Sequence, residues 1–158
     1  MEIEKPSRVR RTYTQTLTGP PDRVFPLLCP VRERDWVPNW NPKRVITTSG
    51  VAEQDGIFVT EAAPQDAVWV ITRHDAGAGI LEMVKITPDH TVCKLEIALS
   101  TRGEQGTKAD ISYEYTALGP LGEAFLKGFT EEWYRDFMKE WETALNHYLT
   151  TGEMLTSD

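Results

Sequence analysis

Apolar and polar residues alternate near the start of the chain. Val9, Tyr13 and Leu17 fall on one face of an extended stretch otherwise made of Thr, Arg and Gln. A period of two is typical of a strand with one buried face. The pattern predicts a first strand near residues 8 to 18.

Two short helices are predicted after this strand. Pro20 and Pro21 suit a first helical turn, and an apolar stripe follows them until Pro30 stops the helix. Residues 31 to 36 can form one or two further turns, which end before Pro38. The first strand is therefore separated from the next by a helical pair.

Strand-like segments then follow one another at intervals of about ten residues, the spacing of an antiparallel meander. Gly, Pro, Asp and Ser clusters separate them. The six predicted strands are residues 44 to 49, 56 to 62, 66 to 74, 80 to 87, 91 to 101 and 107 to 117. The last two alternate most regularly, and their apolar positions predict the buried face: Cys93, Leu95, Ile97, Leu99, Ala109, Ile111, Tyr113, Tyr115 and Ala117.

The period changes to 3.6 after Pro120 and stays helical to about Thr150. Successive steps of four residues make the apolar stripe wind around the helix. A helix that wraps along a twisted sheet needs such a stripe, although a slight bend near Gly128 also serves. The pattern predicts one long terminal helix and a frayed tail at residues 151 to 158.

Seven antiparallel strands cannot bury their apolar face alone, so the long helix is expected to cross it. The predicted fold is α+β, of the helix-grip kind: a curved antiparallel sheet with two short helices after the first strand and a long C-terminal helix across the concave face. One domain over residues 1 to 158 is expected, since this length suits one core.

This order of elements resembles the START/Bet v 1-like (SRPBCC) superfamily over nearly the whole chain. Residues 25 to 40, FPLLCPVRERDWVPNW, and residues 128 to 132, GFTEE, resemble a bacterial branch labelled polyketide cyclase/dehydrase-like. The resemblance implies a cavity between sheet and helix for lipids, sterols, polyketides or other apolar ligands. It also implies that some members catalyse isomerisation, dehydration or cyclisation.

Charge and composition exclude several other functions. There are 17 Lys and Arg against 24 Asp and Glu, a formal charge of −7, which disfavours nucleic acid and anionic membrane surfaces. No window is apolar enough for membrane insertion, and Met1 to Thr12 lack a signal-peptide pattern, so a cytoplasmic location is expected. Two cysteines and three histidines lack metal-ligand spacing, and residues 76 to 79 lack the helix that follows a phosphate-binding loop. We therefore expect neither metal nor cofactor.

Aromatic residues are the candidate ligand contacts, because they are expected to point between sheet and helix. They are Trp36, Trp40, Phe58, Trp69, Tyr113, Tyr115, Phe125, Phe129 and Trp133. The alternative is that the same residues fill a solid core. The two tyrosine hydroxyls can bond to a ligand carbonyl, or to neighbouring side chains and water.

The segment around the first tryptophans leaves a similar choice. Trp36 and Trp40 can stack on a flat ligand at the cavity mouth, or plug one end of the core. Arg32 or Glu33 can bond to the polar end of a ligand, or form solvated or paired groups on the helix surface.

Three functions follow from these alternatives. The first is binding or transport of a hydrophobic or aromatic small molecule. The second is a cofactor-independent cyclase, dehydratase or isomerase that uses a pocket tyrosine or a carboxylate such as Glu132 or Asp136. The third is a protein-interaction module, as in the Hsp90-activator relatives of the fold, which requires a nearly solid interior and an outer apolar patch. The pattern specifies neither the ligand nor an oligomeric state.

Overall fold

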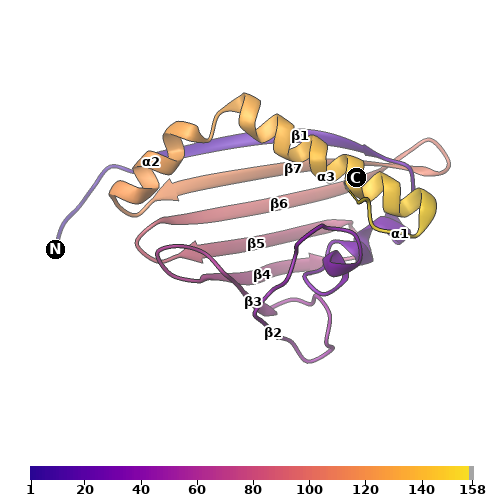
Figure 1. Ribbon diagram of the computed structural model, residues 1–158, viewed down its shortest axis with the longest axis horizontal. Coiled ribbons are helices and arrows are strands. Elements are labelled where there is room, and N and C mark those ends of the chain that lie inside the picture. Colours follow the sequence, from indigo (N-terminus) through magenta and orange to yellow (C-terminus); the bar gives the residue numbers. More distant parts are fainter. Residues whose placement is uncertain (157–158) are drawn as a thin grey trace.

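Seven antiparallel strands form one sheet in the computed structural model, which describes residues 1 to 156 (Figure 1). The order across the sheet is β1-β7-β6-β5-β4-β3-β2, so every strand from β2 onward pairs with its neighbour in sequence and β1 closes onto β7. The strands are β1 Arg8–Leu17, β2 Arg44–Ile46, β3 Ile57–Thr60, β4 Ala67–Asp75, β5 Ile80–Thr87, β6 Thr91–Arg102 and β7 Gly106–Ala117.

Two of the strands are shorter than the sequence pattern predicts. β2 ends at Ile46 and not at residue 49, because Ser49 turns the chain: its backbone N–H and its hydroxyl both donate to the Glu53 carboxylate, each at 2.6 Å. β3 covers only Ile57–Thr60, against the predicted 56 to 62. The other five strands lie within two residues of their predicted bounds.

The helical pair after β1 is confirmed. It consists of α1 Pro21–Val24, which runs on into the 3-10 turn η1 Phe25–Leu27, and of the 3-10 turn η2 Arg32–Asp35. Pro21 occupies the first helical position, where its missing N–H costs nothing.

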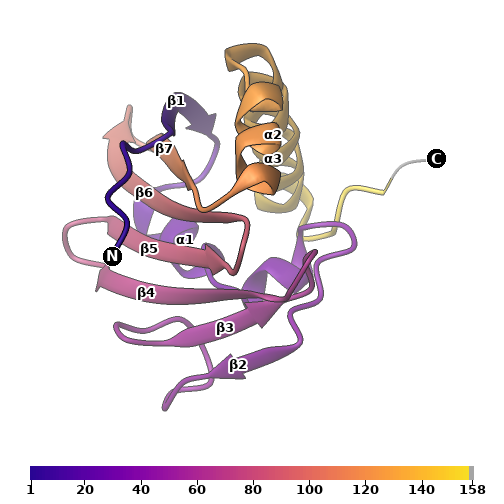
Figure 2. The same cartoon turned by 90° about the vertical axis from the view of Figure 1, so that its left-hand side faces the viewer.

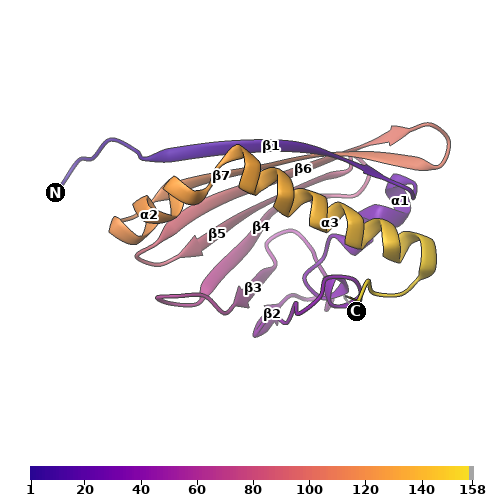
Figure 3. The same cartoon turned by 45° about the horizontal axis from the view of Figure 1, so that its top comes forward.

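The predicted continuous terminal helix is wrong at one point. The chain forms α2 Pro120–Gly128 and α3 Glu131–Thr151, and the break falls beside Gly128. Thr130 causes the restart as the N-cap residue of α3, because its hydroxyl accepts a hydrogen bond from the Trp133 N–H at 3.1 Å. The drifting apolar stripe therefore belongs to two helices with different axes (Figure 3).

Helix α3 is fastened to one side of the sheet. Gln15 on β1 donates to the Met138 carbonyl at 3.0 Å, and the Tyr134 hydroxyl donates to the Ile111 carbonyl on β7 at 2.9 Å. In Figure 2 the two helices accordingly lie beside β1 and β7, with β2 to β4 on the far side of the curved sheet. Open space can therefore remain above the central strands.

The inward face agrees with the predicted one. Cys93, Leu95, Ile97 and Leu99 are buried, as are the facing positions of β7 from Ala109 to Tyr115. None of the helices within residues 1 to 156 is long and apolar enough to cross a membrane. Gly152 ends α3 in a left-handed conformation, so the tail starts one residue later than the predicted residue 151, and residues 157 and 158 lie outside the described range.

Candidate functional site

A cavity of about 360 Å³ lies between the concave face of the sheet and the helices. Its wall is mainly aromatic, with a few aliphatic and polar side chains. It is lined by Glu33, Val37, Trp40, Phe58, Trp69, Met83, Lys85, Leu95, Tyr113, Tyr115, Phe125, Phe129, Trp133, Phe137 and Trp141. The volume lies at the lower end of the range for small-molecule sites, roughly 300 to 1,000 Å³.

One row of side chains crosses the sheet under this cavity. Phe58, Trp69, Lys85, Cys93 and Tyr115 stand directly opposite one another on β3, β4, β5, β6 and β7. The rings of Phe58 and Trp69 stack, with centroids 5.0 Å apart and planes at 15°. Because side chains alternate along each strand, a residue in this row shares the inward direction of its cross-strand partners. Lys85 is the one charged member.

The opposite wall comes from α2 and α3. Phe125 and Phe129 approach Tyr115 with ring centroids at 4.7 and 4.9 Å. Trp133 stacks on Phe137 at 5.4 Å and keeps 47% of its surface exposed. Trp133 therefore stands at the rim of the cavity, where the wall meets solvent.

The two tryptophans of the helical segment differ in position. Trp36 is fully buried, donates from Nε1 to the Leu27 carbonyl at 3.0 Å, and packs edge-on against Trp141 at 5.0 Å. Trp40 is half-buried, donates to the Pro30 carbonyl at 2.8 Å and does line the cavity. Trp36 thus plugs the core behind the wall, whereas Trp40 forms part of the wall.

Glu33 is buried, with 6% of its surface exposed, and its side chain reaches the cavity. Burial raises the pKa of its carboxyl to about 8. Glu33 also contributes to the raised pKa of Tyr113, after burial and the charges of Tyr115, Cys93 and Tyr134, and both side chains line the cavity. A protonated carboxyl at neutral pH can donate a hydrogen bond or a proton to a ligand.

Lys85 marks a second polar position. Its Nζ lies 5.0 Å from the centroid of the Trp69 ring and 6.0 Å from that of Tyr115. Burial lowers the pKa of this amine and raises that of Tyr115, the latter well above its ordinary value. Burial likewise raises the pKa of the neighbouring Cys93 thiol to about 12, which keeps it protonated and unreactive.

Glu33 and Lys85 both line the cavity. Within residues 1 to 156, no buried side-chain nitrogen or oxygen atom is both sealed from open space and without a hydrogen-bond partner. No ion pair in the same range includes Glu33 or Lys85. Among the described residues, the Glu33 and Lys85 side chains therefore reach the cavity without an ion-pair partner.

The structure brings together all the aromatic candidates except Trp36. Glu132 and Asp136 are exposed and do not line the cavity, so they are poorly placed for acid–base chemistry inside it. The charged residues of η2 differ in their surroundings. Arg32 pairs with Asp35 at 2.9 Å on the surface, as the alternative of paired surface groups requires. That alternative is wrong for Glu33, which is buried because its position in the turn faces inward.

Sequence reasoning did not single out Lys85. Its neighbours Val84 and Ile86, which point to the opposite face, are apolar, so β5 lacks the alternation that would show its inward face. A signal was nevertheless present. A tight turn after Thr87 pairs Lys85 with Cys93, which already belonged to the predicted buried face.

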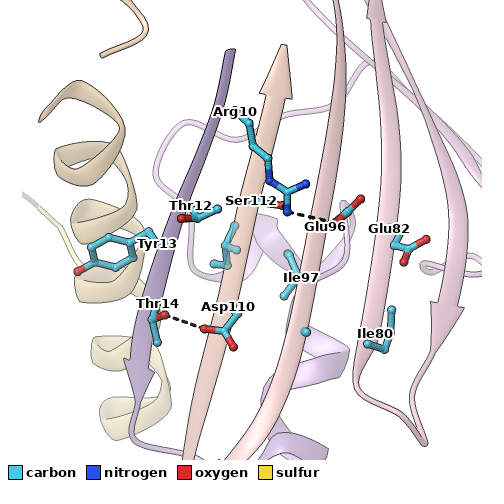
Figure 4. Close-up of a pocket in the computed structure, with 12 residues that line it drawn as sticks. Arg10, Thr12, Tyr13, Thr14, Ile80, Glu82, Glu96, Ile97, Asp110 and Ser112 are labelled. Carbon is cyan, nitrogen blue, oxygen red and sulfur yellow. Dashed lines mark hydrogen bonds and ion pairs between the residues drawn. The ribbon is translucent and has the colours of Figure 1, made fainter. Parts of the chain in front are cut away.

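A second hollow lies on the outer face of the sheet (Figure 4). Its polar groups pair with one another: Thr14 donates to Asp110 at 2.6 Å, and Arg10 contacts both Ser112 at 3.3 Å and Glu96 at 3.8 Å. Such satisfied surface pairs do not need a ligand. Across the described residues, no cluster of three or more His, Cys, Asp or Glu side chains could hold a metal ion.

The order of elements and the enclosed cavity define the helix-grip fold of the START/Bet v 1-like proteins, and solved structures show the same fold. No protein-family model matches the chain, and no curated protein matches it by sequence. The resemblance to the bacterial polyketide cyclase/dehydrase-like branch therefore stays a prediction.

Three similar structures illustrate the range. Norcoclaurine synthase from Thalictrum flavum, in complex with dopamine and hydroxybenzaldehyde, matches with a TM-score of 0.66 and 12% identity over 97% of this chain and 91% of that one. Ara h 8.0201 matches with a TM-score of 0.61 and 13% identity, over 92% and 99%. The Mll3558 protein from Rhizobium loti matches with a TM-score of 0.63 and 14% identity, over 90% of this chain and 100% of that one.

Proposed function

We propose that this protein binds or carries an apolar, aromatic small molecule in the cavity between sheet and helices. The observation that carries the proposal is an aromatic wall around about 360 Å³ of open space, which also contains the side chains of Glu33 and Lys85. Apolar burial would supply the affinity, and the polar groups would set the orientation of the ligand. The norcoclaurine synthase complex, with two aromatic molecules on the same fold, supports this choice of ligand class.

Tryptophan fluorescence and thermal unfolding test the proposal. Trp40, Trp69 and Trp133 line the cavity, so a bound aromatic compound is expected to quench or shift their emission and to raise the melting temperature. A broad set of aromatic polyketides, fatty acids and sterols should include at least one such ligand. If no compound in the set changes either the tryptophan fluorescence or the melting temperature, the proposal is contradicted.

A pair of variants connects the response to the cavity. Leu95→Phe adds bulk at the cavity floor and is expected to weaken binding. Leu121→Phe adds the same bulk on α2, where Leu121 is 54% exposed and outside the cavity lining, and is expected to leave binding unchanged. Equal loss in both variants would contradict binding at this site.

A second candidate function is cofactor-independent acid–base catalysis, as a cyclase, dehydratase or isomerase. Glu33 favours it, because a carboxyl with a pKa of about 8 that faces an apolar cavity can exchange protons at neutral pH. Any ligand found above is to be incubated with the protein and followed by mass spectrometry and chromatography. Loss of turnover in Glu33→Gln, with ligand binding retained, would support the enzyme. A ligand recovered unchanged from the wild type would contradict catalysis and leave the carrier function in place.

Two further expectations stay predictions. The interaction-module alternative requires a nearly solid interior, and the cavity does not favour it. A cytoplasmic location stays a prediction from the sequence, and the lack of nucleic acid partners is expected from the sequence charge.

A further inference from the structure

Lys85 differs from the paired lysines of the protein. Lys43 and Lys108 lie at the surface and pair with Asp66 at 3.0 Å and Asp110 at 3.8 Å. Lys85 lies in the inward row of the sheet and has no acidic partner among the described residues. Its amine lies instead over the faces of two aromatic rings. A lysine held in this way has its amine presented to the interior of the cavity.

An amine without a charged partner in an apolar site can act as a nucleophile. Burial disfavours the ammonium form, so the neutral amine, which carries the reactive lone pair, is more populated than at an exposed lysine. Each unit by which the pKa falls raises the neutral fraction about tenfold near neutral pH. Lys85 is thereby set apart chemically from exposed lysines such as Lys94.

Other titratable groups surround this amine from several elements. The thiol of Cys93 on β6 and the phenol of Tyr115 on β7 are held neutral by burial, since their pKa values are raised. His90, in the turn after β5, has a pKa lowered by burial and by the charge of Lys85. Of the remaining groups in the cavity wall, Glu33 has a pKa near 8 and Tyr113 a raised one. At neutral pH these neighbours are mainly uncharged, so they leave the amine without an anion to hold its proton.

We propose that Lys85 forms an imine with the carbonyl carbon of an aromatic aldehyde or ketone bound in the cavity, an inference that rests on the proposed small-molecule function. The Nζ lone pair attacks the carbonyl carbon and the C=O π bond breaks, giving a carbinolamine. The nitrogen loses its protons to the former carbonyl oxygen, the C=N bond forms, and the oxygen leaves as water. One amine and one carbonyl thus give one imine and one water, with no oxidant or reductant.

The surroundings favour this product. Trp69 and Tyr115 flank the amine with ring faces, on which an aromatic carbonyl compound can stack while its carbonyl carbon meets Nζ. The mainly aromatic lining displaces water when a ligand binds, and exclusion of water slows hydrolysis of a reactive intermediate. The substrate class is therefore a flat, apolar carbonyl compound.

Reductive trapping tests the inference. The whole protein is incubated near neutral pH with benzaldehyde, cinnamaldehyde or 2-naphthaldehyde and sodium cyanoborohydride, which converts an imine into a stable secondary amine. Intact mass and peptide mapping are expected to show an adduct on Lys85 before any adduct on an exposed lysine such as Lys94. Lys94→Arg should leave the early adduct in place, and Lys85→Arg should abolish it.

Binding of 2-naphthalenemethanol, which lacks the carbonyl, separates the two proposals. If tryptophan fluorescence shows that the alcohol binds but none of the three aldehydes labels Lys85 selectively, the imine is overturned and the carrier function stands. If the aldehydes label Lys85 and the alcohol does not bind, the imine stands, and the covalent bond to the carbonyl carbon is what retains the ligand in the cavity. If neither occurs, the imine is overturned, and the carrier proposal is left to the broader ligand set.

Discussion

The amine of Lys85 lies 5.0 Å from the centre of the Trp69 ring, across the β4–β5 strand pair. The ring face offers this cation partial stabilisation, roughly 0.5 to 2 kcal/mol in proteins, in place of a carboxylate. The contact explains how a lysine is tolerated in an inward row. It also shows that the row is not optimised for stability alone, because an apolar side chain would need no such compensation.

Replacing this amine should stabilise the fold. In Lys85→Met a side chain of similar length fills the same space without a charge, and the unfolding free energy near pH 7 is expected to rise by about 1 kcal/mol. Because the folded-state pKa is below its ordinary 10.5, the unfolded chain binds more protons, and wild-type stability rises with pH between those two values. The gain from Met should therefore shrink as pH increases through that window.

Urea unfolding across a pH series measures this effect. Lys94→Met, at an exposed position on β6, is the matched control and should stay within about 0.5 kcal/mol of the wild type. A Lys85→Met variant less stable than the wild type by more than about 1 kcal/mol would mean that the amine has a stabilising partner.

Glu33 should make stability fall with rising pH. Its pKa is near 8 in the folded protein and 4.5 in its ordinary state, so between these values the unfolded chain loses the proton that the folded one keeps. The wild type is expected to lose up to ~1.4 kcal/mol of unfolding free energy per pH unit in this window. In Glu33→Gln this pH-dependent component should disappear, so the stability of the variant relative to the wild type is expected to increase as pH rises from 5 to 8.

Unfolding free energies at several pH values, compared with those of the exposed-site control Glu140→Gln, check this slope. Parallel curves for the wild type and Glu33→Gln would show that Glu33 ionises normally.

The two indole N–H groups should differ in their contribution to stability. Trp36→Phe removes a hydrogen bond in the fully buried core and leaves the Leu27 carbonyl without its indole partner. A cost of about 2 to 3 kcal/mol is expected. Trp40→Phe removes a similar bond to Pro30 at a half-buried position and should cost about 1 kcal/mol.

Thermal or urea unfolding of both variants gives the comparison, and ligand binding adds a second readout. Trp40→Phe should change the fluorescence response to a bound aromatic compound, because Trp40 lines the cavity and Trp36 does not. Equal costs, or a ligand response that depends on Trp36, would contradict these assignments.

Gly122 should not accept a side chain. A Cβ at this position of α2 would clash with the His90 carbonyl oxygen and lie 3.0 Å from the Cα of Ala117, so the helix would have to move away from the β5–β6 turn. Gly122→Ala is expected to destabilise the fold by more than about 3 kcal/mol or to prevent folding. Gly128→Ala, where nothing lies within 4 Å, should be neutral or stabilise by about 0.5 kcal/mol.

The melting temperatures of the two variants provide the measurement. A tolerated Gly122→Ala would mean that α2 is not packed closely on this turn.

The sequence predicted the fold because its local patterns were strong. Alternation in β6 and β7 identified their buried face, from Cys93 to Tyr115, and proline and glycine positions separated the elements. It also indicated Gly128 as the place where the C-terminal helix could bend. It did not show that Thr130 caps a new helix there, because the same apolar stripe fits both a bent helix and two successive helices.

The candidate site was predictable only in its aromatic part. Aromatic side chains at inward positions of strands and helices meet in any structure with this order of elements, so Phe58, Trp69, Tyr115 and Phe129 could be chosen from periodicity. Trp36 could not be separated from Trp40 in this way. Both have indole N–H groups bonded to backbone carbonyls, and only packing against Trp141 places Trp36 behind the wall.

By itself, the sequence determined the order of elements, the inward face of the last two strands and the charge that disfavours nucleic acid. The tertiary structure alone decided that the interior is hollow and that Glu33 and Lys85 open into it. The physical reason is that strand periodicity acts over neighbouring residues. Desolvation of a charged group, in contrast, depends on every segment packed around it: β4, β6, β7 and the helices for Lys85, and the whole cavity wall for Glu33.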